Sequence, residues 1–89
     1  MNAPIKHRHS KPRPHQIERR RIAQGQRLRT QRLTLGLTQS QVAQRADMPS
    51  GQYARYEQGI LDPSLPVLIR LAEALECTSD HIIGLSEEI

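Results

Sequence analysis

The stretch from Gln39 to Gln58, QSQVAQRADMPSGQYARYEQ, decides the fold of this chain. Two segments of about eight residues with apolar positions at helical spacing flank a short turn, the pattern of two helices packed across a tight connection. Ala43 is small enough for the two helices to cross closely. Asp47 lies in the turn and is one of the few non-glycine residues that tolerate a left-handed backbone. The stretch therefore predicts a helix, a turn and a second helix.

The two predicted helices have different inner and outer faces. Apolar side chains fall on the inner faces, where we expect core packing rather than a stacking surface: Val42, Ala46, Met48, Tyr53 and Tyr56. The outer face of the second helix is polar and carries Ser50, Gly51, Gln52 and Arg55. In DNA-binding proteins with two such helices, the outer face of the second one enters the major groove.

Further helices are predicted on both sides of this stretch. Dispersed apolar residues from Ile17 onward, with no proline before Pro49, predict a long helix that ends at Gly36. Thr38 and Gln41 fit a capping box for the helix that starts at Gln39. A later helix has a proline in its first turn and core-facing residues at i, i+3, i+4 and i+7, namely Leu65, Leu68, Ile69, Ala72 and Leu75.

The end of the chain completes a compact all-α domain. Thr78 is placed to cap a last short helix that carries Ile82, Ile83 and Leu85. We therefore expect five helices over residues 17–86, followed by a tail at 87–89. Residues 1–16 hold three of the six prolines and almost nothing apolar, so we expect a disordered basic arm there.

The composition excludes several classes of protein. There is no run of apolar residues long enough to span a membrane, and no apolar segment follows the basic N-terminus as in a secretory signal. A single cysteine, Cys77, cannot form an internal disulfide, and we expect a buried thiol there. We expect no metal site, since His7 and His9 alone on an arm do not make one, and no cofactor. No nucleophile–base pair, carboxylate cluster or phosphate loop predicts an enzyme. The chain is expected in the cytoplasm.

Charge is divided between the two parts of the chain. Residues 1–36 carry ten Lys or Arg and one acid, whereas residues 37–89 carry three Arg and eight acids, which together give the net charge of +4. Such an asymmetry favours a segment that binds a polyanion, joined to a separately folded body.

From about Ile22 to Leu85 the chain resembles the Cro and lambda-repressor-like family of helix-turn-helix proteins, also called XRE. The resemblance rests on RLRTQRLTLGLTQSQVA (27–43), ARYEQG (54–59), DPSLPVLIRLAEAL (62–75) and TSDHIIGL (78–85), in this order. It implies a five-helix lambda-repressor-like fold and a transcriptional regulator that binds specific double-stranded DNA. Relatives bind palindromes as dimers, so it also implies a repressor acting as a homodimer on a palindromic operator.

The resemblance assigns roles to individual residues. Gln39 matches a phosphate-binding glutamine that braces the recognition helix, and its position at a helix start favours that role. The other implied DNA contacts are the base-facing Ser50, Gly51 and Arg55, Gln52 beside the phosphate backbone, and the phosphate-approaching Gln58 and Gly59. Arg32 and Glu57 match a structural ion pair between the first helix and the end of the recognition helix.

Four positions depart from the family pattern. Pro49 stands where relatives often have a Ser or Thr cap, so we expect the recognition helix to start one residue later with Ser50 as its cap. Gly51 offers no side chain for direct readout, which gives DNA shape more weight. Gln31 replaces an apolar residue of the first helix. The loop over residues 60–62 lacks the cations that relatives often aim at phosphates.

The cationic segment and the apolar end of the chain suggest further contacts. We expect seven cations to bind phosphates and raise affinity rather than specificity: Lys6, Arg8, Lys11, Arg13, Arg19, Arg20 and Arg21. His81 is expected to be an exposed helix residue. The candidate dimer surface consists of Ile60, Leu61, Ile83 and Ile89, with Ile82 and Leu85 added if the core does not need them.

Two alternatives remain open at this point. The same fold serves DNA-binding antitoxins, in which the basic arm would be the segment that folds on a toxin partner. A protein- or RNA-binding adaptor on this scaffold is the other alternative, because the predicted recognition face is sparse.

Overall fold

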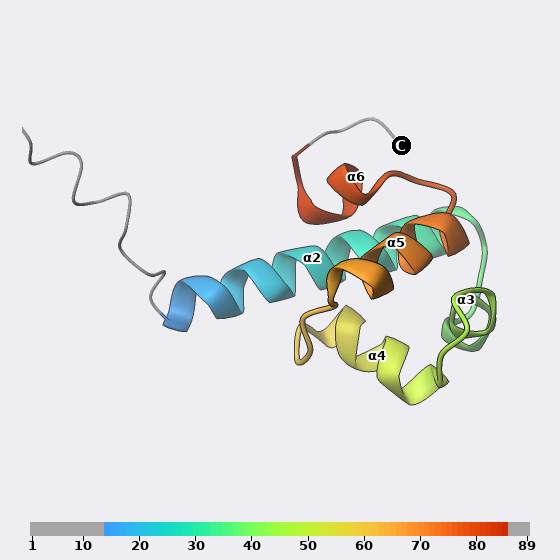
Figure 1. The fold of residues 1–89 in the computed structure, drawn as a ribbon, viewed down its shortest axis with the longest axis horizontal. Coiled ribbons are helices and arrows are strands. Elements are labelled where there is room, and N and C mark those ends of the chain that lie inside the picture. Colours follow the sequence, from blue (N-terminus) through green and yellow to red (C-terminus); the bar gives the residue numbers. More distant parts are fainter. Residues whose placement is uncertain (1–13, 86–89) are drawn as a thin grey trace, which may run out of the picture.

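Helix α2 (Pro14–Thr34) is the longest of the described helices, and helices α4 and α6 pack directly against it (Figure 1). The computed structural model describes residues 14–85. Within this range the order is α2, α3 (Gln39–Arg45), α4 (Ser50–Gln58), α5 (Leu65–Ala74) and α6 (Ser79–Ile83), with no strand. The predicted all-α fold is therefore confirmed. None of the described helices combines the length and apolar character needed to cross a membrane.

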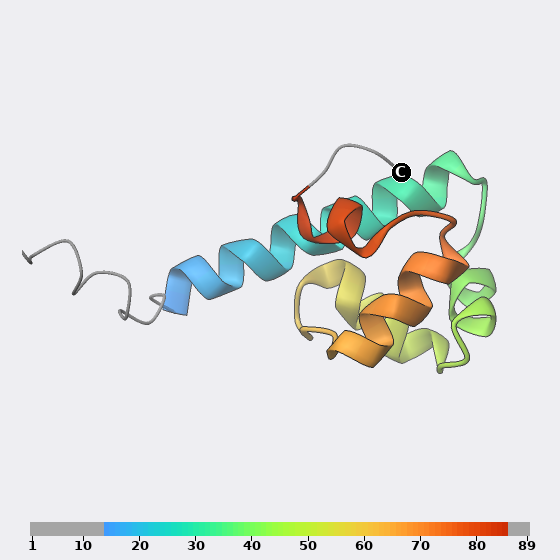
Figure 2. The same ribbon diagram turned by 45° about the horizontal axis from the view of Figure 1, so that its top comes forward.

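Helix α2 begins earlier than the sequence pattern predicts. It starts at Pro14 rather than at Ile17, because proline is tolerated in the first turn of a helix. The first turns extend beyond the other helices in both views (Figures 1 and 2). The rest of the predicted arm, residues 1–13, and the tail at 87–89 lie outside the described residues.

The helix-turn-helix stretch has the local geometry that its sequence predicts. Thr38 accepts a hydrogen bond from the Gln41 backbone N–H at 3.1 Å, and the Gln41 side chain accepts one from the Thr38 N–H at 2.8 Å. This is the predicted capping box of α3. Asp47 has a left-handed backbone with φ of 57°. The turn is closed by the Met48 N–H, which donates to the Ala43 carbonyl at 3.0 Å.

The predicted cap of α4 is wrong. The N-cap is Pro49, which has an extended backbone and no side-chain hydrogen bond to the helix, and Ser50 is already the first helical residue. A side chain can cap only from the extended position before the helix, so Ser50 lies one residue too late to do so. Its hydroxyl is consequently free of a capping role.

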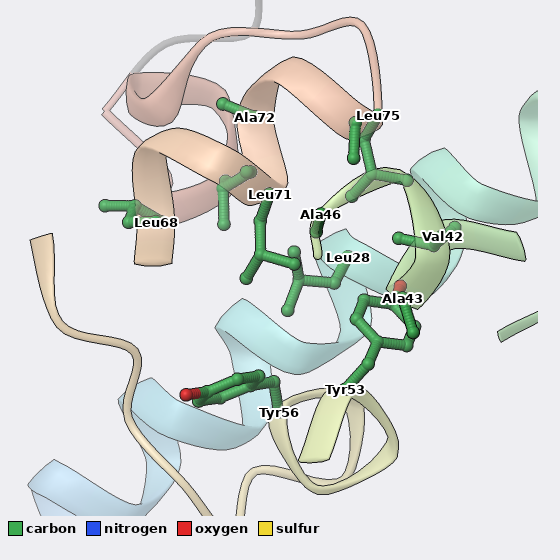
Figure 3. Packing of buried hydrophobic residues seen from close by; sticks show 12 residues of the cluster. Leu28, Val42, Ala43, Ala46, Tyr53, Tyr56, Leu68, Leu71, Ala72 and Leu75 are labelled. Atoms are coloured by element: carbon green, nitrogen blue, oxygen red, sulfur yellow. The ribbon is translucent and has the colours of Figure 1, made fainter. Parts of the chain in front are cut away.

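Leu28 of α2 occupies the centre of the core. Figure 3 shows it surrounded by side chains from α3, α4 and α5. Tyr53 is fully buried and Tyr56 is 7% exposed, so both tyrosines belong to the core as predicted. The other buried apolar residues are Val42, Ala43, Ala46, Leu68, Leu71, Ala72, Ala74, Leu75 and Ile82, with Met48 and Leu35 partly buried beside them.

The surroundings of Gln31 explain why a polar residue stands where the family usually has an apolar one. It is a buried polar side chain, 4% exposed, and its amide donates to the carbonyl of Leu75 at 2.9 Å. Leu75 is the C-cap of α5, where carbonyls lack partners within the helix. A polar residue on α2 thus satisfies the end of α5 inside the molecule.

Five residues differ from the core and surface predictions. Leu65 and Ile69 are exposed, because the buried stripe of α5 runs through Leu68, Leu71 and Leu75 and no described element covers the adjacent face. Leu85 is exposed and lies beyond α6, whose C-cap is the left-handed Gly84. His81 and Cys77 are both partly buried, whereas we expected an exposed histidine and a buried thiol. Burial raises the pKa of the Cys77 thiol.

Candidate nucleic-acid interface

The outward face of α4 presents a short polar surface. Ser50, Gly51, Arg55 and Gln58 are exposed, while Tyr53 and Tyr56 on the opposite side hold the helix against the core. The Arg55 side chain has no hydrogen-bond or ion-pair partner among the described residues. Its guanidinium therefore keeps all of its donors for a ligand.

No contact within the described part of the chain requires a glycine at position 51. A Cβ at this position would meet no atom within 4 Å, and the backbone does not have positive φ. Glycine in a helix is less favourable than alanine, so the fold alone would prefer a side chain here. Because Gly51 has no side chain, the main chain of α4 is exposed to solvent at the first turn of the outward face.

An ion pair fixes α4 to α2. Arg32 Nε lies 2.6 Å from Glu57 Oε2 and Nη2 lies 3.1 Å from Oε1, with side chains that are only 11% and 5% exposed. Arg32 Nη1 also donates to the Leu37 carbonyl at 3.0 Å. Gln39 Nε2 donates to Glu57 Oε1 at 3.0 Å and adds α3 to the network. The structure thus brings Arg32, Gln39 and Glu57 together, which sets the position of α4 against α2 and α3.

The network shifts the ionisation of its members. Burial alone would raise the pKa of Glu57, but the hydrogen bonds from Arg32 and Gln39 outweigh it and lower this pKa below its ordinary value. The pKa of Arg32 is raised by its hydrogen bond to Glu57. Burial is also the main cause of the raised pKa of Tyr53, whose hydroxyl makes no hydrogen bond of acceptable geometry with a described residue. All three groups keep their usual charge at neutral pH.

Residues 23–82 match the protein family described as a helix-turn-helix domain. The chain belongs to this family. Two known proteins are similar to this helix-turn-helix protein. One is the cryptic phage CTXphi transcriptional repressor RstR of Vibrio cholerae serotype O1, 34% identical over 59 residues, which are 66% of this chain and 53% of the relative. The chain thus spans about half the length of the curated relative it matches.

The other is a solved structure. The crystal structure of the restriction-modification controller protein C.AhdI from Aeromonas hydrophila superimposes with a TM-score of 0.67 and 30% identity, covering 68% of this chain and 92% of that one. The predicted resemblance to helix-turn-helix DNA-binding proteins is confirmed by these matches.

Two predicted contact residues of the helix-turn-helix protein, besides Gln39, have internal partners. Gln52 Nε2 donates to the Tyr56 hydroxyl at 3.0 Å along the same helix. Gly59 is buried with a left-handed φ of 77°, and an added Cβ would lie 2.8 Å from the Ile22 Cα. Its N–H donates to the Tyr56 carbonyl at 3.2 Å, and its carbonyl accepts from Arg21 Nε at 3.2 Å. Gly59 is therefore packed under α2 and has no free N–H for a phosphate.

The basic first half of α2 lies beside the loop that follows α4. Arg21 donates a hydrogen bond to the Gly59 carbonyl, and Gln24 Nε2 donates one to Asp62 Oδ1 at 3.4 Å. A hollow of about 290 Å³ between them is lined by Ile17, Arg20, Arg21, Gln24 and Asp62. Cations thus approach the loop from α2 although the loop has none. Lys6, Arg8, Lys11 and Arg13 lie outside the described residues.

Sequence reasoning missed Arg29 of the helix-turn-helix domain. This exposed arginine lines a second hollow, of about 380 Å³, together with Arg32, Gln39, Glu57 and Gln58. The spacing of Arg29 and Arg32 places both on one side of α2, and this i, i+3 pair was the available indication in the sequence. The predicted Arg32–Glu57 ion pair and two predicted DNA contacts, Gln39 and Gln58, thus share one surface with a second cation, Arg29.

Three of the four predicted dimer-surface residues are exposed. Ile60 is 60%, Leu61 36% and Ile83 38% accessible. The fourth, Ile89, lies outside the described residues. Exposed Leu65 and Ile69 of α5 add to the apolar side chains that the described fold leaves uncovered.

Proposed function

We propose that this helix-turn-helix protein binds specific sequences of double-stranded DNA through α4 and represses transcription from a palindromic operator. The observation that carries the proposal is the polar outward face of α4, fixed to α2 by the buried Arg32–Glu57 pair. A rigidly held helix with unpaired polar side chains is suited to reading base edges in the major groove. The names of the similar proteins, a transcriptional repressor and a restriction-modification controller, support the regulatory role.

Arg55 is the proposed principal base contact. Its guanidinium is exposed and has no partner among the described residues, and arginine recognises guanine through two parallel hydrogen bonds. Ser50 contributes a hydroxyl at the start of the same face. Gln39 and Gln58 are proposed to contact phosphates at the edge of the groove, Gln39 through groups left free by its bond to Glu57. Gln52 is proposed to make only a minor contact with the DNA phosphate backbone, because its amide is already hydrogen-bonded to Tyr56.

The basic half of the chain is proposed to supply affinity without sequence preference. Arg19 and Arg20 are exposed on α2, and Arg20 lines the hollow beside the loop that carries Asp62 in place of a cation. Neutralised phosphates release counterions, so the affinity contribution depends on salt. Deletion of residues 1–13 should therefore make log K less dependent on log salt concentration; an unchanged slope would refute a phosphate role for that segment.

Two copies are proposed to bind each operator. One short recognition helix covers only a half-site, and the exposed apolar side chains Ile60, Leu61 and Ile83 offer a surface for a second copy. The protein is proposed to act in the cytoplasm as a binding protein without a cofactor.

Selection of bound duplexes from a random DNA pool tests the function. We expect enrichment of a palindromic motif, and with Arg55→Ala the enrichment should relax at one base pair in each half-site. Binding of every duplex alike, without any enriched motif, would show that the protein is not a sequence-specific regulator. Stronger competition by structured RNA than by duplex DNA would favour an RNA-binding adaptor instead.

A further inference from the structure

A hollow lies beside the recognition helix, at the place where α2, α3 and α4 meet. Its volume is about 380 Å³, and its lining residues come from all three helices: Arg29, Arg32, Gln39, Glu57 and Gln58. Arg29 and Gln58 are exposed, whereas Arg32 and Glu57 form its nearly buried floor. Three of the five side chains carry charge, so the hollow is a polar site.

The acid in this hollow is already neutralised. Both oxygens of Glu57 are occupied, since Oε2 accepts from Arg32 and Oε1 accepts from Arg32 and Gln39. The remaining charge is that of Arg29, which has no hydrogen-bond or ion-pair partner among the described residues. The Gln58 amide is likewise without a partner there. The hollow therefore presents one uncompensated cation and one free amide donor toward solvent.

From this arrangement we infer that the hollow binds a phosphate group of the DNA backbone, with Arg29 as its cation and Gln58 as a second donor. A phosphate oxygen fits this chemistry because a guanidinium and an amide are both donors, and the only carboxylate present is bound to Arg32. The inference rests on the proposed function and adds a contact from α2 to those of α4. Arg29 would thus supply, next to the recognition helix, the charge that the loop over residues 60–62 lacks.

Binding of Arg29→Gln to the duplex selected by the wild-type protein tests the inference. Over a series of salt concentrations, we expect affinity to fall about three- to tenfold and the slope of log K against log salt to decrease by about one per bound copy. The loss should be equal for selected and random duplexes, because a phosphate carries no sequence information. Arg29→Lys should retain the slope, since it retains the charge.

Arg70→Gln is the matched control. Arg70 is exposed on α5 and does not line the hollow, so it removes the same charge elsewhere and should leave the slope nearly unchanged. Melting curves of both variants should match the wild type, because neither side chain has a partner within the described residues. Equal slopes for Arg29→Gln and Arg70→Gln would overturn the inference and leave the proposed function intact. Failure of the wild type to bind any duplex would instead overturn the proposed function, and the inference with it.

Discussion

Gly25 of α2 brings the helix so close to α4 that the backbone carbonyl of Glu57 occupies the space a side chain at position 25 would need. A Cβ there would also lie 2.7 Å from the Tyr56 carbonyl oxygen. Neither obstacle is a flexible side chain, so the backbone itself would have to move. The close approach places the end of α4 directly on α2, beside the Arg32–Glu57 pair.

Gly25→Ala should therefore destabilise the protein by about 1–3 kcal/mol or more, because the added methyl group forces α2 and α4 apart. Urea denaturation measures the free energy of unfolding. Gly51→Ala is the matched control, since its added Cβ meets no atom within 4 Å. Equal stability of Gly25→Ala and the wild type would contradict the packing described for α2 and α4.

The two ion pairs of the described chain should differ in their contribution to stability. Glu57→Gln breaks a pair whose side chains are 11% and 5% exposed, and should cost about 3 kcal/mol because it leaves Arg32 buried without its counter-charge. Glu76→Gln breaks the Arg45 pair, whose side chains are 44% and 62% exposed, and should cost less than about 1 kcal/mol. Thermal and urea denaturation of both variants would reveal the difference; similar losses would argue against the burial of the first pair.

The contribution of Glu57 should depend on pH in one direction. Its pKa in the folded protein is lowered from the ordinary value of 4.5, so unfolding takes up a proton as the pH falls through this range. The difference in unfolding free energy between wild type and Glu57→Gln should be constant from pH 7 to about pH 5. It should shrink as the pH falls through the lowered pKa of Glu57. A difference that stayed constant down to pH 3 would mean that the carboxylate is not stabilised by its partners.

Gly51→Ala should fold as well as the wild type or slightly better, because alanine is the better helix former and the space is open. DNA affinity should nevertheless fall, since the methyl group would stand between the first turn of α4 and the base pairs. Calorimetric unfolding and binding to the selected duplex give the two quantities. Unchanged affinity would show that α4 does not approach DNA closely at this turn.

Arg55→Ala should weaken binding to the selected duplex by about 1–3 kcal/mol and relax one base position. Binding to random duplexes should fall less, because the lost contact is to a base. The control Arg70→Ala removes an exposed arginine from α5 and should bind as the wild type does. An equal loss of affinity for selected and random duplexes would assign Arg55 to a phosphate instead.

Ile83→Asp should abolish the proposed dimer without unfolding the protomer, because the side chain is 38% exposed in the described fold. Sedimentation equilibrium measures the mass, and the circular dichroism spectrum should remain helical. Leu33→Asp introduces the same charge at a residue that is 56% exposed on α2 and outside the predicted surface, so it should leave the dimer intact. A wild-type protein that stays monomeric at high concentration and binds one copy per palindrome would refute the dimer.

The parts of the fold that could be predicted from sequence are those set by local chemistry. The Thr38 capping box, left-handed Asp47 and the left-handed Gly36 that follows α2 all depend on neighbouring residues alone. The predicted cap of α4 is wrong because it rested on the residue type of Ser50. Capping depends instead on the backbone conformation of the position before the helix, which is Pro49.

Tertiary features could be predicted less well. Leu65 and Ile69 have the helical spacing of core residues, but burial depends on whether another element covers that face, which periodicity does not report. The hollow at Arg29 and the burial of Gly59 arise from packing between helices distant in sequence. The Arg32–Glu57 pair could be anticipated because a resemblance supplied its long-range partner, not because spacing did.

The early start of α2 changes the thermodynamics expected of the basic half of the chain. Arg19, Arg20 and Arg21 belong to a continuous helix of 21 residues, about 30 Å long, so their backbone is already ordered before DNA arrives. Their engagement with phosphates would cost side-chain freedom only, whereas a coil would also lose backbone conformational entropy. If this part of the cationic segment binds the duplex as proposed, it would do so as a preformed helix, and binding should leave the helix content of residues 14–21 unchanged.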